Sequence, residues 1–405
     1  MKVVIIGGGI GGLTTAIALS QRLPEGSQID IYERVPDLTP IGAAISVWGN
    51  GVKVLKALGL GAQIEGYAGD MQSMAYTSST GVPLCDFPLS PLYERVSQRA
   101  CPIARTNLQK LLLDGALSSR GVKLYLNKRA MDMAQTGDNK VSVTFEDGEV
   151  VEGADLVVVA DGTHSKLRDV VAGRTVARNY VGYVNFNGAV PITPTLGDPR
   201  KWTQFVGDGK RVSMMPMGEG KFYFFFDVVL PPKTASHPDR YREELAEHFA
   251  GWPQPVQELI ASLNPATVAR VDISDIEELE TFVRGRAVLL GDSAHGTAPD
   301  LGQGGCQAME DAWVLARCLG DHAGDVAAAL KQYDTERVAR TVHLVSRARK
   351  RAEMIHGKDM EATRAWYAEL AAETGENIME GMAKTILGAP AELDGIIAKL
   401  NTVTA

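Results

Sequence analysis

The chain has few cysteines, and their spacing forms no known cysteine motif. Its 405 residues include four widely separated cysteines and seven histidines, with no CxxC pair and no metal-ligand spacing among them. This composition excludes a disulfide-rich secreted fold and a zinc module. We expect reduced thiols, no metal and a cytoplasmic location. The four cysteines are Cys85, Cys101, Cys306 and Cys318.

Long apolar runs and basic clusters are also missing. No apolar run approaches the roughly 18 residues of a membrane span. The opening "MKVVIIGGG" lacks the long apolar segment and cleavage site of a signal peptide. The formal net charge of -8 argues against nucleic acid as a partner. The basic run in "ERVARTVHLVSRARKRAEMIH" is interpreted as a solvated helix face or a lid.

The N-terminus carries a dinucleotide-binding pattern. A β-branched strand, Val3 to Ile6, runs into "GGGIGG" and then into the helical pattern "LTTAIALSQRL". Gly7 permits a tight turn, Gly9 lets the backbone approach a pyrophosphate, and Gly12 lets helix and strand pack closely. Gly11 completes the loop, and the helix N-terminus offers N–H groups to an anion.

A second strand identifies the kind of nucleotide. The segment "IDIYE" ends at Glu33, 21 residues after Gly12. A carboxylate at this position accepts hydrogen bonds from a ribose diol and repels a 2'-phosphate, which favours FAD or NAD over NADP. Arg34 follows as a further candidate contact. No second GxGxxG lies between a strand and a helix, so a second dinucleotide can only bind transiently.

Two later motifs decide between FAD and NAD. A strand over Leu156 to Ala160 ends in Asp161-Gly162, and "GRAVLLGDSAHGTAPDLGQGG" gives another strand ending in Gly291-Asp292. These segments resemble the DG and GD motifs of the para-hydroxybenzoate hydroxylase-like flavin monooxygenases, and the resemblance covers nearly the whole chain. It implies FAD as the resident cofactor. Asp292, at the carboxyl end of a parallel strand, can accept the hydroxyl protons of the ribityl chain.

The glycine-rich segment after Asp292 is expected to lie against the flavin ring. It begins a helix whose N-terminal N–H groups would favour the anionic edge of a reduced flavin. The family commonly has Asn where this chain has Cys306 and Ala where it has Ser293. We interpret Cys306 as a packing residue and His295 as a structural hydrogen-bonding residue. The candidate ring contacts are Gly302, Gln303, Gly304, Gly305 and Cys306.

Two further segments match the family near FAD. Arg105 in "CPIARTNLQKLLLDGAL" matches an arginine placed near the diphosphate and ribityl. The segment "GAAISVWGNGVKVLKALGL", from Gly42 to Leu60, matches a loop that flanks the ring, with Ser46 and Val47 as candidate contacts. Gly49 stands where Pro is common, which should loosen the turn.

The pattern of apolar residues along the chain predicts an α/β fold. We expect a Rossmann-like FAD-binding domain with an inserted, mainly antiparallel β substrate domain and a C-terminal helical segment. Strand-like alternations fill Tyr180 to Asp227, whereas the last stretch is helical in pattern. The expected division is 1–75, 100–178 and 278–330 for FAD binding, 76–99 and 179–277 for the substrate, and 331–405 for C-terminal helices.

The segment "GKRVSMMPMGEGKFYFFFDVVLP" predicts a hairpin that turns at residues 218–220. Pairing Met217 with Lys221 brings Arg211 opposite Asp227, Ser213 opposite Phe225 and Met215 opposite Tyr223. Two interpretations of Arg211 stay open: an exposed ion pair with Asp227, worth about 0.2 to 1 kcal/mol, or a fork that grips an anionic substrate.

Several segments resemble the FAD-dependent urate hydroxylases within this family. They include "GAAISVWGNGVKVL", "VGYVNFNGAV", "GKRVSMMP", "FYFFFD" and "TAPDLGQGGCQAMED". The resemblance implies catalytic Arg211, Tyr223 in contact with the substrate ring, Asp300 near the flavin, and Asn185 in contact with the substrate. It also implies that NADH and O2 convert urate to 5-hydroxyisourate through a C4a-hydroperoxyflavin.

Asp300 is the candidate general base, and a half-buried site is expected to raise its pKa. The other interpretation is that Asp300 caps the following helix. Two further functions stay open: hydroxylation of another aromatic anion, of hydroxybenzoate or hydroxynicotinate type, and a flavoprotein that inserts no oxygen. The sequence leaves the oligomeric state open.

Overall fold

The most apolar strands of the chain form one sheet. The computed structural model describes residues 1–38 and 43–403, so Gly42 lies outside the described residues. The sheet has six strands in the order β17-β18-β11-β1-β2-β7, all parallel except the β17–β18 pair. Both faces of its central strands are buried, as expected for parallel strands rich in Val and Ile. The bounds are β1 Lys2–Ile6, β2 Gln28–Tyr32, β7 Val122–Tyr125, β11 Leu156–Val159, β17 Val283–Arg284 and β18 Ala287–Leu289.

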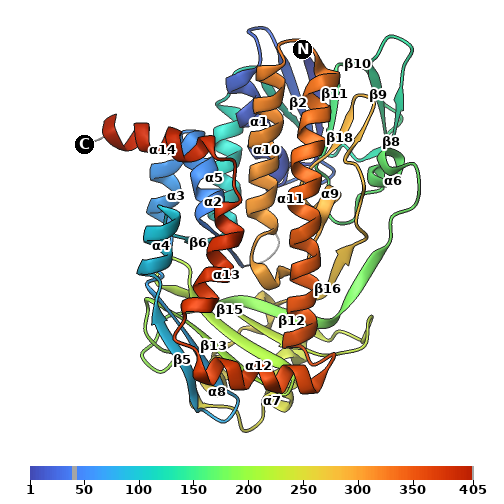
Figure 1. Cartoon of the computed structure of the whole chain (residues 1–405). Helices are drawn as coiled ribbons and strands as arrows, with labels where there is room; N and C mark the ends of the chain where they lie inside the picture. The colour runs from blue at the N-terminus through green and yellow to red at the C-terminus, as the bar shows by residue number, and fades with distance from the viewer. Residues whose placement is uncertain (39–42, 404–405) are drawn as a thin grey trace.

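Helices and a small sheet surround this first sheet. Helix α1 packs against α10 and α5, and α10 packs against α11 (Figure 1). A three-stranded antiparallel sheet, β10-β9-β8, lies to one side. The bounds are α1 Ile10–Arg22, α5 Arg105–Leu117, α6 Leu167–Ala172, α9 Asp292–His295, α10 Gly304–Asp321, β8 Ala130–Gln135, β9 Val141–Phe145 and β10 Val150–Ala154.

A seven-stranded sheet, called the roof sheet below, forms the second layer. Its order is β16-β12-β15-β14-β13-β4-β5, and every pair is antiparallel except β13–β4. β4 begins at Ser73, ahead of the expected boundary at 76. The bounds are β4 Ser73–Ser78, β5 Pro83–Pro88, β12 Arg178–Pro191, β13 Lys201–Gly207, β14 Lys210–Pro216, β15 Lys221–Val228 and β16 Ala269–Ile276.

The predicted register of the hairpin is confirmed. Arg211 pairs with Asp227, and Met215 pairs with Tyr223. One face of the roof sheet packs on an apolar cluster that includes residues of α7 Tyr241–His248 and α8 Gln254–Ser262. The opposite face carries the polar side chains of the hairpin toward the first layer. The expected α/β class, with a mainly antiparallel second sheet, is therefore confirmed.

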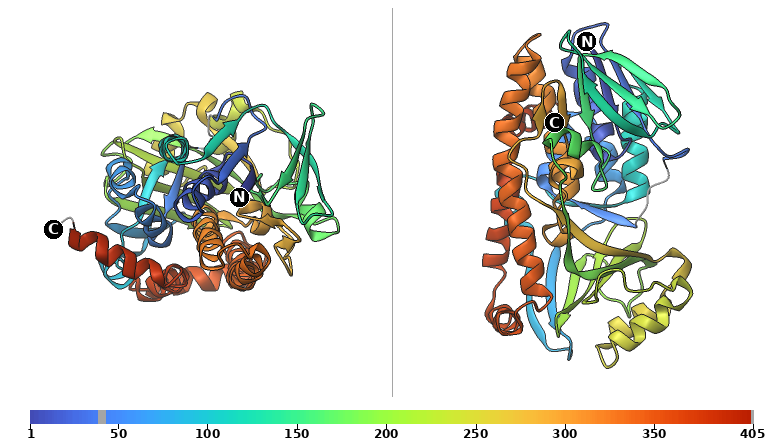
Figure 2. Two further views of the ribbon diagram at one scale, coloured as in Figure 1. Left: turned by 90° about the horizontal axis from the view of Figure 1, so that it is seen from above. Right: turned by 90° about the vertical axis from the view of Figure 1, so that its right-hand side faces the viewer.

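A long helix, α11 Val326–Ile355, runs along both layers, and further helices follow it (Figures 1 and 2). Among residues 1–38 and 43–403, no helix is long and apolar enough to span a membrane. The remaining bounds are β3 Ala44–Val47, β6 Cys101–Ala104, α2 Gly49–Ala57, α3 Gly61–Tyr67, α4 Ser90–Val96, η1 Pro238–Arg240, η2 Pro265–Thr267, η3 Pro299–Leu301, α12 Met360–Ala372, α13 Glu376–Leu387 and α14 Glu392–Val403.

Candidate functional site

The glycine loop after β1 has little room for side chains. Gly7 has φ +110°, and a Cβ added to it would overlap the carbonyl oxygen of Ala160. A Cβ added to Gly12 would overlap the carbonyl oxygen of Gly7. At Gly9, in contrast, no heavy atom lies within 4 Å of the added Cβ. Two glycines are therefore required by packing, while Gly9 leaves the backbone open to a ligand.

This loop borders a cavity of about 580 Å³. Glu33 lines it, and its carboxylate accepts hydrogen bonds from the N–H groups of Gly8, at 2.7 Å, and Val35, at 3.1 Å. A carboxylate has about four acceptor sites, so ribose hydroxyls can still bind there. Other predicted cofactor contacts on the same cavity are Gly7, Gly9, Arg34, Arg105 and Asp161.

Gln109 is a cavity residue that the sequence interpretation missed. Its Nε2 donates to the carbonyl oxygen of Gly8 at 2.6 Å, which ties α5 to the glycine loop. The available signal was spacing, because Gln109 follows Arg105 by one helical turn and so lies on the same face. Both residues line the cavity.

Asp161 supplies an observation that tests the fit of a polar cofactor. Its Oδ1 is buried and has no hydrogen-bond partner among the described residues. Burial raises the pKa of Asp161, although Ser165 and nearby arginines partly oppose the shift. Buried polar atoms are rarely left unpaired, so this oxygen requires a donor from a ligand or water. A nucleotide with hydroxyl groups provides one, and the cavity therefore fits FAD.

The DG and GD motifs are joined by one buried arginine, Arg168, which the sequence interpretation did not include among the site residues. Arg168 donates to the carbonyl oxygens of Ser293, at 2.6 Å, and Asp292, at 3.0 Å. It also donates to those of Gly162 and Thr163 in the DG loop. The side chain of Asp292 itself is exposed, and its Oδ1 faces Gly304. The carboxylate of Asp292 is therefore available to hydroxyl donors.

The start of α10 is packed tightly around its glycines. Gly302 has φ +62°, and a Cβ added to it would lie 2.8 Å from Nε1 of Trp48. A Cβ added to Gly305 would lie 2.5 Å from Cδ1 of Ile45. The side chain of Gln303 is buried and accepts a hydrogen bond from Asn50 at 2.8 Å, so its backbone is the part available to a ligand.

Cys306 is a buried thiol on the first turn of α10. It is buried, accepts a hydrogen bond from the N–H of Trp48 at 3.3 Å, and burial raises its pKa to about 12. This agrees with packing rather than catalysis. Ser46 and Val47, expected in a loop, belong to strand β3. This strand joins the two layers, because the hydroxyl of Ser46 contacts Sδ of Met215 at 3.2 Å, while Val47 is fully buried.

His295 has a structural partner. Its Nε2 lies 2.6 Å from Oδ2 of Asp311, and Nε of Arg337 donates to the other oxygen of that carboxylate at 2.5 Å. All three side chains are buried. The cluster fastens the GD loop to α10 and α11, which agrees with the structural role expected of His295.

On the roof sheet, Arg211 lies between two buried carboxylates. Its Nε is 2.8 Å from Oδ2 of Asp227, and its Nη2 is 3.0 Å from Oδ1 of Asp300. Neither acidic side chain is exposed to solvent. The guanidinium also lies over the ring of Phe225, 5.0 Å from its centroid. Arg211 therefore forms the ion pair with Asp227 that one of the two interpretations predicted, but this pair is buried, whereas an exposed pair was expected.

Asp300 differs from its expected state. Burial alone would raise its pKa, but Arg211 and His356, together with a hydrogen bond from Tyr183, lower the pKa to about 2. The Tyr183 hydroxyl donates to Oδ2 at 2.7 Å. The predicted rise in pKa is thus wrong, because these partners outweigh desolvation. The capping interpretation is wrong as well, since α10 begins without a side-chain cap.

Asn185 takes part in the same cluster. Its Nδ2 donates to Oδ1 of Asp227 at 2.7 Å, and its Oδ1 accepts from Asn187 at 2.9 Å. The sequence interpretation missed Tyr183 and Asn187. Both lie two residues from Asn185 along β12, so the three side chains share one face of the strand, and this spacing could have identified them. Tyr223 lies on β15, near the charges of Asp227 and Arg211, and burial raises its pKa to about 12.

Comparisons with known proteins agree with this geometry. The model of the FAD binding domain family matches residues 1–348. The chain is 49% identical to a FAD-dependent urate hydroxylase of Klebsiella pneumoniae subsp. pneumoniae, over 96% of this chain and all of that protein. It is 46% identical to one of Mycolicibacterium vanbaalenii, over 96% of this chain and 98% of the relative.

A solved structure shows the same fold. Klebsiella pneumoniae HpxO, complexed with FAD and uric acid, superposes with a TM-score of 0.90 at 47% identity, covering 96% of this chain and 97% of that chain. Together with the family match and the cavity that fits FAD, this likeness identifies the cofactor and the family. The chain belongs to the FAD binding domain family, within its FAD-dependent urate hydroxylases, and FAD is its cofactor.

Proposed function

We propose that this protein hydroxylates urate at C5 and consumes NADH and O2. The observation that carries the proposal is the buried Arg211 on the roof sheet, held by Asp227 and Asp300 in a chain that shares fold and family with urate hydroxylases. The reaction converts urate, O2, NADH and a proton to 5-hydroxyisourate, NAD⁺ and water. FAD, when bound, would supply the two-electron redox chemistry that couples NADH to the activation of O2.

The chain's own residues would hold FAD along its length. The backbone of the glycine loop and the N-terminus of α1 would bind the pyrophosphate, Glu33 the ribose, and Arg34 and Arg105 the phosphates. Asp161 and Asp292 would accept hydroxyl protons. The backbone at the start of α10 and the end of strand β3, with Ser46 and Val47, would flank the ring. The proposed backbone contacts are Gly7, Gly9, Gly11, Gly12, Gly302, Gln303, Gly304, Gly305 and Cys306.

Arg211 would bind the anionic substrate. Its Nε and Nη2 donate to the two carboxylates, while no hydrogen bond from Nη1 is seen among the described residues. A fixed guanidinium stabilises the charge that develops when urate loses a proton. Asn185 would contact a polar edge of the substrate, and Tyr223 its ring.

Asp300 would accept the proton of urate. Its carboxylate is ionised and hydrogen-bonded by Tyr183 and Arg211, so its orientation is fixed before substrate binds. A pKa of about 2 makes Asp300 a weak base. The proton must therefore leave Asp300 promptly for turnover to continue.

We also propose that the two large sheets mark two domains, with the first substrate-domain segment beginning near Ser73 rather than at 76, and that the protein works in the cytoplasm. The sheet strands at 73–88, 178–228 and 269–276 support the first statement. The four buried cysteines, none of which forms a disulfide, support the second.

The experiment is turnover of the purified yellow protein with NADH, first without and then with O2, in the presence and absence of urate. The expected result is urate-dependent O2 uptake and a transient ultraviolet signal of 5-hydroxyisourate. Hydroxybenzoates and hydroxynicotinates serve as comparison substrates. If one of them supports coupled hydroxylation and urate does not, the urate assignment is wrong. If none supports oxygen insertion, the protein is not a hydroxylase.

A further inference from the structure

His356 lies where α11 ends, behind the roof-sheet cluster. It is buried, and its Nδ1 is 3.1 Å from the carbonyl oxygen of Gly209. Because a carbonyl only accepts hydrogen bonds, Nδ1 carries the hydrogen, and Nε2 is the atom that can gain or lose a proton. This Nε2 has no hydrogen-bond partner among the described residues.

The free nitrogen faces both buried carboxylates. Nε2 is 3.7 Å from Oδ1 of Asp300 and 3.8 Å from Oδ2 of Asp227. The imidazole also stacks on the ring of Tyr183, with 3.8 Å between centroids and 27° between planes. A shift of well under 1 Å would bring Nε2 within hydrogen-bond reach of Asp300.

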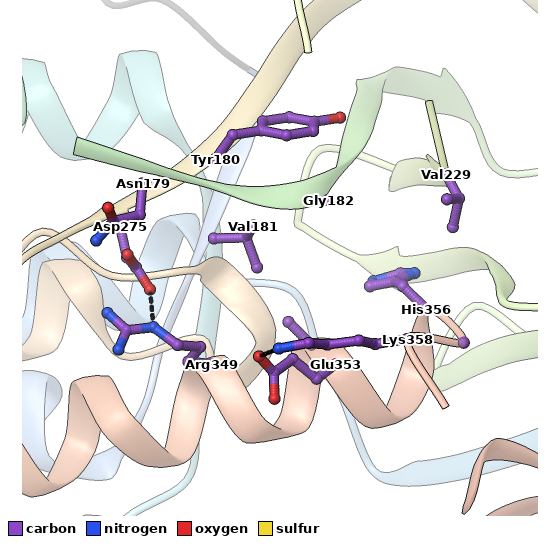
Figure 3. Close-up of a pocket in the computed structure, with 12 residues that line it drawn as sticks. Asn179, Tyr180, Val181, Gly182, Val229, Asp275, Arg349, Glu353, His356 and Lys358 are labelled. Atoms are coloured by element: carbon purple, nitrogen blue, oxygen red, sulfur yellow. Dashed lines mark hydrogen bonds and ion pairs between the residues drawn. The ribbon is translucent and has the colours of Figure 1, made fainter. Parts of the chain in front are cut away.

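His356 also lines a second cavity, of about 550 Å³ (Figure 3). The cavity lies between the start of β12, the end of β16 and the last turns of α11. Here the pairing of β12 with β16 is irregular between Tyr180 and Val184, and Gly182 has φ +108°. This bulge separates the strands beside the active site. His356 therefore lies between Asp300 and this cavity.

The charged groups that face His356 are mainly negative. Two carboxylates face it, and the single guanidinium of Arg211 offsets only one of them. The C-terminus of α11 adds partial negative charge beside the ring. In the cavity, Arg349 pairs with Asp275 at 2.7 Å and Lys358 pairs with Glu353, so neither cation is directed at the imidazole (Figure 3). Further titratable side chains near this site are Tyr180, Tyr183 and Tyr367.

We propose that His356 takes the proton that urate gives to Asp300 and releases it to water in the second cavity. This inference rests on the proposed function. First an N–H bond of urate breaks and an O–H bond forms at Asp300. That O–H bond then breaks while an N–H bond forms at Nε2 of His356. Nε2 is buried in the resting structure, so the imidazole turns toward the cavity, water there removes this proton, and the ring returns to its starting state with no net change in atoms or electrons.

The low pKa of Asp300 is consistent with this route. A protonated carboxyl whose pKa is held near 2 is a strong acid relative to an imidazole. Tyr183 cannot act as the acceptor, because its hydroxyl already donates to Asp300 and burial raises its pKa well above the usual value. His356 is therefore the acceptor that the geometry provides.

The test uses the holoenzyme and chemical rescue. His356→Ala enlarges the second cavity, and added imidazole can enter it as a substitute base. We expect kcat for urate-dependent O2 uptake to fall about 100-fold, a typical loss for a missing proton-transfer group. Imidazole should restore the rate in proportion to its neutral fraction, and 4-methylimidazole should rescue with a different pH dependence. His343→Ala, an exposed site on the same helix, is the matched control and should keep the wild-type rate.

A second variant addresses the possibility that the small side chain disturbs folding. His356→Asn keeps an N–H donor for the carbonyl of Gly209 but cannot take up a proton. This variant should be stable, should turn over slowly, and should not be rescued by imidazole. The limb of the pH profile that is due to His356 should vanish. A wild-type rate and pH profile in both variants would overturn the inference. So would a slow His356→Ala enzyme that imidazole does not rescue. If the wild type shows no urate-dependent uptake, the proposed function fails and the inference falls with it.

Discussion

The glycine loop and the roof-sheet cluster position ligands by different means. The loop is one contiguous segment, and it works through backbone groups and the absence of side chains at Gly7 and Gly12. The cluster takes Arg211, Asp227, Asp300 and His356 from four separate elements, and it works through charge. Ligand binding therefore depends on free space at the glycine loop and on electrostatics at the cluster. Substitutions should affect the two sites independently.

The largest effect is expected when the central charge of the cluster is removed. Arg211→Leu leaves two buried carboxylates without their cation, which should lower the free energy of unfolding by about 4 kcal/mol. Chemical denaturation of the FAD-bound protein measures this loss. Arg211→Lys keeps the charge and should lose less. If the comparison holds, both variants still purify yellow, and colourless protein would show that the two sites are coupled.

The glycine loop should respond to added volume. Gly12→Ala places a methyl group against the carbonyl oxygen of Gly7, and we expect a loss of about 3 kcal/mol together with loss of FAD. Gly9→Ala is the matched control, since its new methyl group meets no protein atom. This control should be as stable as the wild type without FAD but should bind FAD more weakly. Equal behaviour of the two variants would contradict the steric argument.

The cluster should also give the protein a distinct response to acid. The folded pKa of Asp300, about 2, is below its ordinary value of 3.8, so its ionised form stabilises the fold. That stabilisation is fully present above about pH 5 and is lost as pH falls through the folded pKa. Between pH 5 and pH 2.5, Asp300→Asn should therefore lose less stability than the wild type. Thermal unfolding across this range provides the measurement, and parallel curves would count against the assigned state of Asp300.

The smallest effect is expected at the cysteines. Burial raises the pKa of Cys306 to about 12 and the pKa values of Cys85, Cys101 and Cys318 to about 11. The native protein at pH 8 should therefore react slowly with a thiol reagent, and Cys306→Ala should keep most of its activity. Rapid labelling of Cys306 with loss of turnover would show that this thiol has a role in catalysis.

The contrast between the glycine loop and the roof-sheet cluster also explains which features could be predicted from the sequence. The glycine loop, Glu33 and the hairpin register were predictable, because each depends on residues close together along the chain. Asp300 was identified as a candidate from its motif, yet the predicted direction of its pKa shift was wrong. Its partner Tyr183 lies 117 residues away, and His356 comes from the last turn of a helix whose docking no local pattern encodes. Charges that meet only after folding set this pKa.

The central claim is that the roof-sheet cluster presents urate for insertion of an oxygen atom from O2. The most direct measurement is a single turnover of the reduced FAD enzyme with urate and ¹⁸O₂, with mass analysis of the product formed before it decays. The account predicts one labelled oxygen atom in 5-hydroxyisourate from the wild type, and hydrogen peroxide instead from Arg211→Gln. Product that takes its new oxygen from water, or unchanged urate with peroxide from the wild type, would contradict it.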